Sequence, residues 1–528
     1  MALETLDIII VLSYAIILLI IALSVSREKA GHKKDTKDYF LAGKALPWWA
    51  IGASLIAANI SAEQIIGQSG QGYAVGIAIA AYEWQAAIVL LIVAKFFLPI
   101  FLKRGIFTMP QFLDQRYGHG VRSLMSVFWI VLYTAVNLTT VLWLGGLAVS
   151  SVTGLNVLPA MAVLAAFAAL YSLYGGLKAV ALTDIIQVII LIVGGAAITW
   201  IALGLVGGDA GAIGGFERIS KELPGHFRMI LDRDHPAYGD LPGIWTLLGG
   251  LWVLHFSYWG FNQYIIQRAL AAESLREAQA GLVFAAALKL FIPLIVVIPG
   301  IAAVILAQQG QLNADALAER PDRAYGELMT IAPAGLRGLV FAALIAAIVS
   351  SLASMMNSIA TIFTMDVYKA ARPNKSQSHY VSVGRATAFF AIALALALAQ
   401  PFLGGFKSGF QAVQEYTGFV APGVVGIFLL GFFWKRMTTT GAYAVLLGSV
   451  LINVALKFSA PDVPFIIRIW LVFLSCIALG VAASLATAQR NENQPVILRD
   501  IQFSTTPAFN LAAIAVSLIL VGIYVIYW

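Results

Sequence analysis

The chain has 528 residues, of which 60% are hydrophobic and only 11% are charged, with 33 Lys plus Arg, 26 Asp plus Glu and a net charge of +7. Because soluble globular proteins are about 25% charged, this composition excludes a soluble protein and indicates that lipid surrounds most of the surface. The single cysteine, Cys476, excludes a disulfide framework, and average Gly and Pro contents exclude collagenous and low-complexity chains.

Apolar stretches that could cross a membrane recur along the whole chain. A transmembrane helix needs roughly 20 mostly apolar residues, whereas a barrel strand alternates apolar and polar residues over about ten positions. The stretches here are long and do not alternate, so we predict an all-α integral membrane protein with about 14 transmembrane helices. Their predicted limits are 6–25, 47–69, 77–102, 122–150, 157–174, 184–206, 245–265, 278–306, 335–365, 381–402, 410–433, 439–457, 464–487 and 508–528.

The connection after the first span orients the predicted bundle. It is rich in basic residues, namely Arg27, Lys29, Lys33, Lys34, Lys37 and Lys44. The positive-inside rule places this connection in the cytoplasm and the N-terminus outside, and the even number of spans places the C-terminus outside too. The connections then assigned to the cytoplasm hold about twice as many Lys and Arg as the external ones. Because the basic residues are spread over many loops, no nucleic-acid partner is expected.

Two connections, 207–244 and 307–334, are long and would both lie outside. Their mixed charges and their turn-forming Gly and Pro residues predict surface caps. No segment is long and polar enough to form a separate soluble domain, and no required protein partner is indicated.

Polar residues interrupt the second and seventh spans at mid-depth. The second contains Asn59, Ser61, Glu63 and Gln64, and the seventh contains a polar and aromatic stretch over residues 255–263. Because unpaired polar groups are costly in hydrocarbon, such interruptions indicate a functional site. Each interrupted span opens a run of five, and equivalent broken helices in two inverted halves are typical of the binding site of a secondary transporter. The alternative is a pair of polar patches buried between helices.

The ninth span carries Ser350, Ser351, Ser354 and Ser358 at offsets of three and four, which places them on one helix face. Small hydroxyl residues permit close helix packing. Beside a broken helix they would also suit a hard monovalent cation, and the carbonyls of residues 57 and 60 could complete its ligand shell.

Glu83 and Lys289 lie deep within predicted spans, where charged residues usually pair or line a cavity. An acceptor, a donor and flanking aromatic rings are what the binding of a polyhydroxylated ring requires. The alternative is a buried salt bridge that fixes helix register. His255, the histidine at mid-depth, could donate to a ligand or to a neighbouring carbonyl.

Six segments in order, covering nearly the whole chain, give it a strong resemblance to the sodium:solute symporter family, and in particular to its bacterial sugar-transporting members. These segments are Asp38–Trp49, Ala57–Gln64, Tyr174–Val180 with Thr183 and Asp184, Tyr258–Gln263, Val349–Ser354 and Gln414–Gly418. The resemblance implies a multi-pass protein of the plasma membrane, the inner membrane in bacteria, and a LeuT-like core of two inverted five-helix repeats whose first helices are broken. The implied divisions are an extra N-terminal helix and basic loop (1–46), the first repeat (47–206), an external loop (207–244), the second repeat with its external loop (245–433) and three C-terminal helices (434–528).

The resemblance also implies the site residues. Sodium, as the coupling ion and not as a resident cofactor, would be bound by the carbonyls of Ala57, Ile60 and Ala347 and the hydroxyls of Ser350 and Ser351. The sugar would contact Gln64, Glu83, His255, Lys289 and Gln414, and also Tyr258, which would form an inner aromatic gate. Asp184 matches an acidic residue of the cation pathway, although its place at the start of a helix is equally consistent with an N-terminal cap.

Two positions depart from the pattern of the galactose-transporting members, because His255 stands where they have Asn and Ala86 where they have Ser. The expected function is therefore sodium-coupled symport of a galactose- or glucose-type monosaccharide by alternating access, with the particular sugar left open. The alternatives are coupling to protons through carboxylates such as Glu63, and symport of another small polar solute. The chain lacks His-Glu-x-x-His, paired-Cys and Gly-rich phosphate motifs, so we do not expect an enzyme. A sugar sensor that does not transport is a further alternative.

Overall fold

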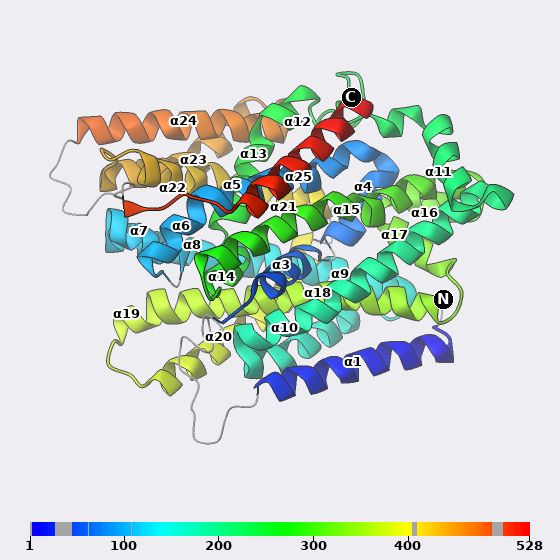
Figure 1. The fold of residues 1–528 in the computed structure, drawn as a ribbon, viewed down its shortest axis with the longest axis horizontal. Helices are drawn as coiled ribbons and strands as arrows, with labels where there is room; N and C mark the ends of the chain where they lie inside the picture. The colour runs from blue at the N-terminus through cyan, green and yellow to red at the C-terminus, as the bar shows by residue number, and fades with distance from the viewer. Residues whose placement is uncertain (1–2, 27–44, 62, 107, 404–408, 488–499) are drawn as a thin grey trace.

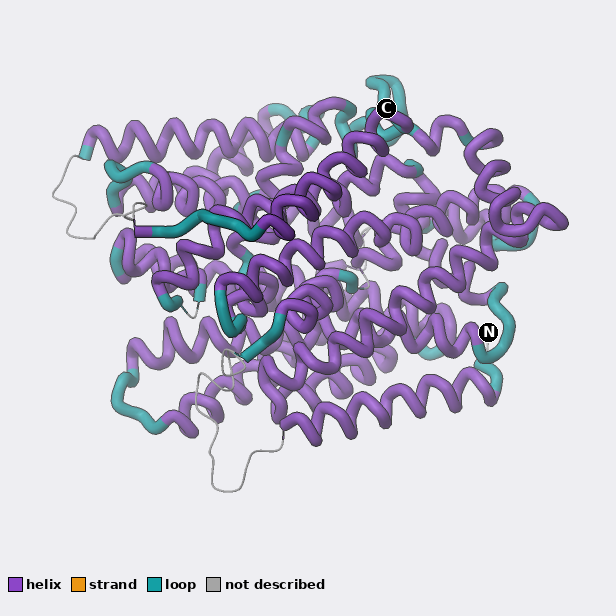
Figure 2. The backbone as a smooth tube through the Cα atoms, viewed as in Figure 1, coloured by secondary structure: helices purple, strands orange, loops and turns teal. Residues whose placement is uncertain are grey.

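The computed structural model describes residues 3–26, 45–61, 63–106, 108–403, 409–487 and 500–528, and for residues 171–185 it describes the backbone alone. Within these ranges the chain forms helices and no strands, with one isolated bridge between Leu46 and Ala272 (Figure 2). The predicted all-α class is confirmed.

The first half of the chain contains one long helix at its end and several short helices before it. They are α1 (Thr5–Ser26), α3 (Trp48–Asn59), the π-helical η2 (Glu63–Gln68), α4 (Ser69–Ala74), η3 (Ile77–Ala80), α5 (Ala81–Ile92), η4 (Val93–Phe97), α6 (Leu98–Arg104), α7 (Met109–Tyr117), α8 (His119–Val131), η5 (Leu132–Leu138), α9 (Thr139–Thr153) and α10 (Val157–Gly207).

The second half of the chain starts at residue 208, at the beginning of the segment predicted as an external cap. Its helices are η6 (Gly208–Ala210), α11 (Gly211–Glu222), η7 (Pro224–Phe227), α12 (Ile244–Leu248), α13 (Gly250–His255), η8 (Phe256–Gly260), α14 (Gln263–Leu270), α15 (Leu275–Gln308), α16 (Ala314–Glu319), η9 (Pro321–Arg323), α17 (Ala324–Thr330), α18 (Leu336–Ile362), η10 (Phe363–Tyr368), α19 (Lys369–Ala371), α20 (Gln377–Leu403), α21 (Gly409–Gly418), α22 (Ala421–Phe433), α23 (Thr439–Ser459), α24 (Phe465–Ala486) and α25 (Pro507–Ile526).

Length and composition identify nine membrane-spanning helices among the described residues, or up to eleven when each of two bent pairs is one span. Two shorter apolar helices, Thr5–Leu18 and Val157–Leu170, lie outside this count. The chain is therefore a multi-pass membrane protein, and the total of about 14 spans stays a prediction. One difference is clear: the spans predicted at 157–174 and 184–206 both lie within α10, which continues over the predicted connection.

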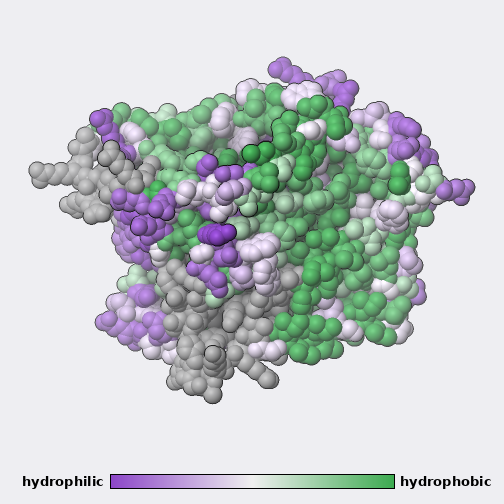
Figure 3. Space-filling view, in the orientation of Figure 1, coloured by the Kyte–Doolittle hydropathy of each residue, from purple (hydrophilic) through white to green (hydrophobic). Residues whose placement is uncertain are grey.

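Apolar side chains cover the outside of the bundle. Leu511 and Val525 on α25 and Phe390 on α20 are at least 70% exposed. In Figure 3 hydrophobic residues form a broad band between hydrophilic residues at the two ends of the molecule. Because this much exposed apolar surface would be unfavourable in water, the band faces lipid and its two borders are the membrane surfaces.

The N-terminal segment contacts the start of α18, directly after the second predicted cap, and the C-terminal segment contacts the first predicted cap. The Asp7 carboxylate accepts hydrogen bonds from the backbone of Gly335 at 2.7 Å and of Gly338 at 2.8 Å, at the start of α18. At the other terminus the backbone N–H of Met229 donates to the carbonyl of Tyr527 at 2.7 Å. The N-terminus lies at the same end of the bundle as α11 and α17, opposite α7 and α19 (Figure 1).

The innermost helices are α3, α4, α15 and α18. Of the most apolar window of α18, 89% is buried inside the protein, against 17% for α25. Helix α15 approaches α4 so closely that a Cβ atom on Gly300 would lie 2.0 Å from the carbonyl oxygen of Ser69. Only glycine fits there, and this contact fixes α4, the second half of the first broken helix, against α15, which carries Lys289.

Candidate binding site for a cation and a small solute

The first broken helix separates α3 from η2. The two halves bend by 61°, and Ile60 leaves the helix with φ −78° and ψ 91°. In a continuous helix the N–H of Ser61 would donate to the carbonyl of Ala57, but here it donates to the side-chain oxygen of Gln64 at 3.2 Å. The Ser61 hydroxyl donates to the same oxygen at 2.9 Å. The break predicted in the second span is confirmed, and the Gln64 side chain holds it in place of a backbone hydrogen bond.

The second broken helix separates η8 from α14. Asn262 has an extended backbone, with ψ 122°, and its side-chain oxygen caps α14 by accepting from the N–H of Tyr264 at 3.2 Å. The hydroxyl of Tyr133, from η5, donates to the same oxygen at 2.8 Å and accepts from the N–H of Gln263 at 2.8 Å. The interruption predicted in the seventh span is therefore confirmed and lies at residues 261–262.

A third bend, of 43°, separates α21 from α22. The sequence analysis treated residues 410–433 as one continuous span, although Gly418 and Pro422 stand on either side of the bend. Proline at the second position of α22 supports a helix start there, since it has no N–H to donate. The bend directs the first half, α21, toward η2.

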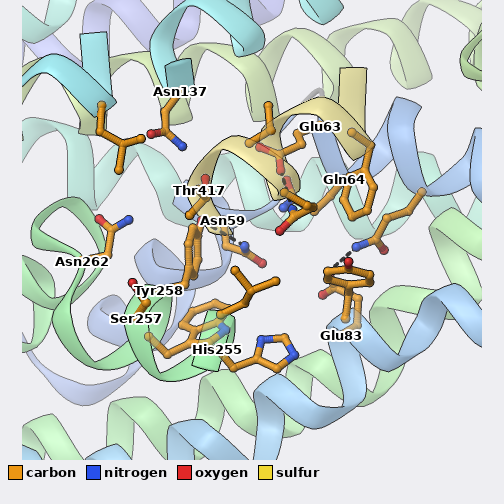
Figure 4. Close-up of a pocket in the computed structure, with 18 of the residues that line it drawn as sticks. Asn59, Glu63, Gln64, Glu83, Asn137, His255, Ser257, Tyr258, Asn262 and Thr417 are labelled. Atoms are coloured by element: carbon orange, nitrogen blue, oxygen red, sulfur yellow. Dashed lines mark hydrogen bonds between the residues drawn. The ribbon is translucent and has the colours of Figure 1, made fainter. Parts of the chain in front are cut away.

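A buried cavity lies where these broken helices meet, with an empty volume of about 690 Å³ including the part open to solvent. All six residues predicted to contact a sugar line it: Gln64, Glu83, His255, Tyr258, Lys289 and Gln414. They come from η2, α5, α13, η8, α15 and α21, and Figure 4 shows four of them around one opening. The structure thus brings together residues that are up to 350 positions apart.

The charged pair predicted inside the membrane is formed. The ammonium of Lys289 contacts the Glu83 carboxylate and also donates to the side-chain oxygen of Asn59, at the end of α3. The other Glu83 oxygen accepts from Gln68 at 2.8 Å. Lys289 also lies 4.8 Å from the centroid of the Trp259 ring. Both side chains are at most 2% exposed, so this network is a buried and nearly neutral polar surface at one wall of the cavity.

Tyr258 is attached to the first broken helix. Its hydroxyl accepts a hydrogen bond from the amide of Asn59 at 3.1 Å, and its ring meets that of Trp259 edge to face at 5.1 Å. Asn59 therefore links Tyr258, on η8, with Lys289, on α15. Through this single amide the two broken helices and the charged pair form one connected set.

Four polar atoms at the cavity have no hydrogen-bond partner within the described part of the chain: His255 Nε2, Tyr82 Oη, Gln68 Oε1 and Asn137 Oδ1. Buried polar atoms are nearly always paired, so four orphans around one cavity indicate a polar ligand or ordered water. The amide oxygens of Gln68 and Asn137 can only accept a hydrogen bond. The Tyr82 hydroxyl can donate or accept, and His255 Nε2 accepts in one of its neutral tautomers.

The predicted cation ligands lie next to this cavity, at the packed interface of α3 and α18. Ala57, Ile60, Ala347, Ser350 and Ser351 are all at most 1% exposed. The Ser351 hydroxyl donates to the carbonyl of Ala58 at 2.9 Å and so joins the two helices beside the break. The side chain of Asp184 lies outside the described residues. Of the two departures, His255 lines the cavity, whereas Ala86 is fully buried and does not.

The prediction omitted several residues that line the cavity: Asn59, Gln68, Asn137, Asn262 and Thr417. Asn59 and Asn262 stand at the two breaks, where side chains outside regular helix often bind a ligand. Their position at the breaks could have identified them as site residues. Asn137 is a single amide within the apolar run of η5, which is a weaker signal. Gln68 follows Gln64 by one helical turn and shares its face.

Comparison with known proteins agrees with this geometry. The sequence model of the sodium:solute symporter family matches residues 39–448. A sodium/glucose cotransporter from Vibrio parahaemolyticus is 48% identical over 538 residues, covering 100% of this chain and 99% of that protein. Sodium/glucose cotransporter 4 from Homo sapiens is 33% identical over 474 residues, covering 84% of this chain and 68% of that protein.

A solved structure shares the fold. It is a Na⁺-coupled sialic acid symporter in a substrate-bound outward-open state, with a TM-score of 0.80 and 21% identity, covering 92% of this chain and 98% of that one. At this identity the likeness concerns the fold alone. The match to the family model over residues 39–448 and the 48% identity to the Vibrio parahaemolyticus cotransporter over the whole chain show more than the fold. The chain belongs to the sodium:solute symporter family.

Proposed function

We propose that this protein is a sodium-coupled symporter of a galactose- or glucose-type monosaccharide that works by alternating access across the plasma membrane, the inner membrane of a bacterium. The observation that carries the proposal is the convergence of six predicted sugar-contacting residues on one cavity at two broken helices. The names of the relatives, two sodium/glucose cotransporters, support the choice of ion and solute.

The cavity suits a neutral polyhydroxylated ring. Lys289 and the amide of Gln414 supply donors, and Glu83 and His255 supply acceptors, while the rings of Tyr82, Tyr258 and Trp259 offer apolar surfaces for C–H groups. In this structure the Lys289 ammonium binds both the Glu83 carboxylate and the Asn59 side chain. A sugar would exchange part of that network for its own hydroxyls, so each buried charge keeps a partner throughout.

Sodium would bind beside the cavity, between α3 and α18. The break leaves the Ala57 carbonyl without its helical donor, and the Ile60 carbonyl points away from the helix axis because of its extended ψ. These oxygens, with those of Ala347, Ser350 and Ser351, form a neutral set suited to a hard monovalent cation. Because Gln64 both holds the break and lines the cavity, sodium and sugar would act on the same segment.

The energetics favour such coupling. One sodium ion crossing about 100 mV releases roughly 2.3 kcal/mol, and a tenfold concentration gradient adds about 1.4 kcal/mol. Together these would support a sugar accumulation on the order of 10² to 10³. The division into two inverted repeats at 47–206 and 245–433, the total of about 14 spans and the external position of both termini are part of this proposal.

The function is tested by uptake of labelled glucose and galactose into proteoliposomes with an inward sodium gradient. The proposal predicts uptake that is lost when choline replaces sodium. Equal uptake in choline would contradict it. A panel of competing sugars in the same assay would identify the preferred substrate.

Proton coupling is a second candidate, which one observation favours: Glu63 is a buried carboxylate in the cavity wall, 8% exposed. A carboxylate can bind and release a proton during a transport cycle, whereas a site of serine hydroxyls and carbonyls cannot. Uptake in choline that increases with an inward proton gradient would establish this candidate and overturn sodium coupling.

A further inference from the structure

The lining of the cavity carries an unequal number of opposite charges. Its formally charged residues are Glu63, Glu83 and Lys289. Lys289 is paired with Glu83, and within the described part of the chain Glu63 has no ion pair. Counting His255 as neutral and Glu63 as ionised, the formal charges of the described lining leave one negative charge in excess, on Glu63.

The described partners of Glu63 are neutral groups. The amide of Gln414 donates to one of its carboxylate oxygens at 3.0 Å, and its backbone N–H donates to the Ser61 hydroxyl at 3.1 Å. The other carboxylate oxygen has no hydrogen bond from any described residue, and the side chain is 8% exposed in the cavity. An ionised carboxylate buried without a counter-charge is costly, so a cationic ligand group would stabilise it, and ionisable residues within membrane spans commonly mark binding sites.

The position of Glu63 places this charge where a solute would bind. It stands directly before Gln64, and its partner Gln414 is the other amide predicted to contact the sugar. Figure 4 shows Glu63 and Gln64 side by side above the opening that Glu83 and His255 border from below. A ring held between these two walls would have one group facing Glu63.

We infer that the cavity also accepts protonated amino sugars, with Glu63 pairing with the ammonium group, and that the same carboxylate excludes acidic sugars. This inference rests on the proposed function. A carboxylate–ammonium hydrogen bond is about twice as strong as one between neutral groups, and it supplies the counter-charge that a neutral hexose lacks. An acidic sugar would bring a second negative charge against Glu63 in a site of low dielectric, which is strongly unfavourable.

The test is competition against sodium-driven uptake of a labelled neutral hexose in proteoliposomes. The probes are D-glucosamine and D-galactosamine at about pH 7, where an amine with a pKa of about 7.7–8.0 is mostly protonated, their uncharged N-acetyl forms, and D-glucuronate. They are compared in the wild type and in Glu63→Gln, which keeps the shape and the hydrogen bond to Gln414. Glu217→Gln on α11, an exposed carboxylate, controls for net charge.

The expected result is that Glu63→Gln weakens inhibition by the amino sugars about tenfold or more while inhibition by neutral hexoses changes far less. Glucuronate should compete poorly in the wild type and better in the variant. Glu63→Asp, which keeps the charge, should retain the amino-sugar preference and serves if Glu63→Gln does not fold.

Three results would overturn the inference: amino sugars that do not compete in the wild type, equal inhibition in the wild type and Glu63→Gln, or a variant in which only the sodium dependence shifts. The last would assign Glu63 to the coupling ion. If neutral hexose uptake itself did not need sodium, the proposed function would fail instead, so the two failures are distinguishable.

Discussion

Replacing Ser351 by alanine is the sharpest perturbation of the proposed sodium site. The hydroxyl is fully buried on α18 and donates its hydrogen to the Ala58 carbonyl at 2.9 Å. A hydroxyl has one donor and two acceptor lone pairs, so this bond leaves lone pairs available to a cation. Ser351→Ala removes a proposed ligand and one link between α3 and α18 without altering the backbone.

The expected loss of sodium affinity follows from the positive charge of the sodium ion that the Ser351 hydroxyl would contact. A polar contact to a charged group contributes about 1.5–3 kcal/mol, which corresponds to a sodium half-saturation concentration about 10- to 150-fold higher. The assay is hexose uptake into proteoliposomes as a function of external sodium. Ser358→Ala is the matched control, because Ser358 is equally buried on the same helix but donates to Gln267 at 3.1 Å, away from the break.

The reasoning is refuted if Ser351→Ala leaves the sodium half-saturation unchanged. It is also refuted if Ser358→Ala shifts it by the same factor, because the effect would then come from general disturbance of α18. A lower maximal rate at an unchanged sodium half-saturation would likewise contradict the ligand assignment.

Three further outcomes are expected. Gln64→Ala should weaken sugar competition about 2- to 10-fold, since it removes one neutral hydrogen-bonding group. Lys289→Met alone should destabilise the protein by about 3–5 kcal/mol, seen as a lower thermal unfolding temperature, because it leaves the buried Glu83 carboxylate without its cation. Adding Glu83→Gln should recover much of the stability but no uptake. Burial lowers the pKa of His226, in the segment predicted as an external cap, below its usual 6.5, although its hydrogen bond to the Tyr73 carbonyl opposes this. The neutral ring is thus favoured in the folded protein, so its contribution to stability is present above about pH 6.5 and is lost as the pH falls toward the lowered pKa.

Each outcome has a control. Normal thermal stability of Gln64→Ala would separate lost sugar contacts from collapse of the break, and unchanged competition would contradict its role. If the double variant Lys289→Met, Glu83→Gln were as unstable as Lys289→Met alone, the unpaired Glu83 carboxylate would not be the cause of the destabilisation. His226→Gln should flatten the acid loss of thermal stability, and an unchanged pH profile would exclude His226 as its origin.

The two breaks were predictable because their signals are local. Asn59, Glu63 and Gln64 fall within one apolar run, and polar groups there must either pair or open the helix. The spans are also local, since a run of apolar residues predicts a crossing without knowledge of its neighbours. The bend between α21 and α22 had a local signal as well, in Pro422, but neighbouring apolar residues concealed it.

The partners of the site residues were not predictable in this way. Lys289 contacts Asn59 from 230 positions away, and Gln414 contacts Glu63 from 351 positions away. Such pairs depend on how the helices pack, to which residues such as Gly300 contribute by permitting close approach to α4. The course of α10 was not predictable from local signals either, because it continues through Gly175 and Gly176, two residues that usually weaken a helix.

The central claim is that sodium and sugar act on the same broken segment, α3 to η2. It is tested most directly by measuring sugar affinity in detergent at high sodium and in choline, and sodium affinity with and without sugar. Binding at linked sites must be reciprocal, so the account predicts that sodium raises sugar affinity and that sugar raises sodium affinity by the same factor, at least about fivefold. Sugar affinity that is equal in sodium and choline would contradict it.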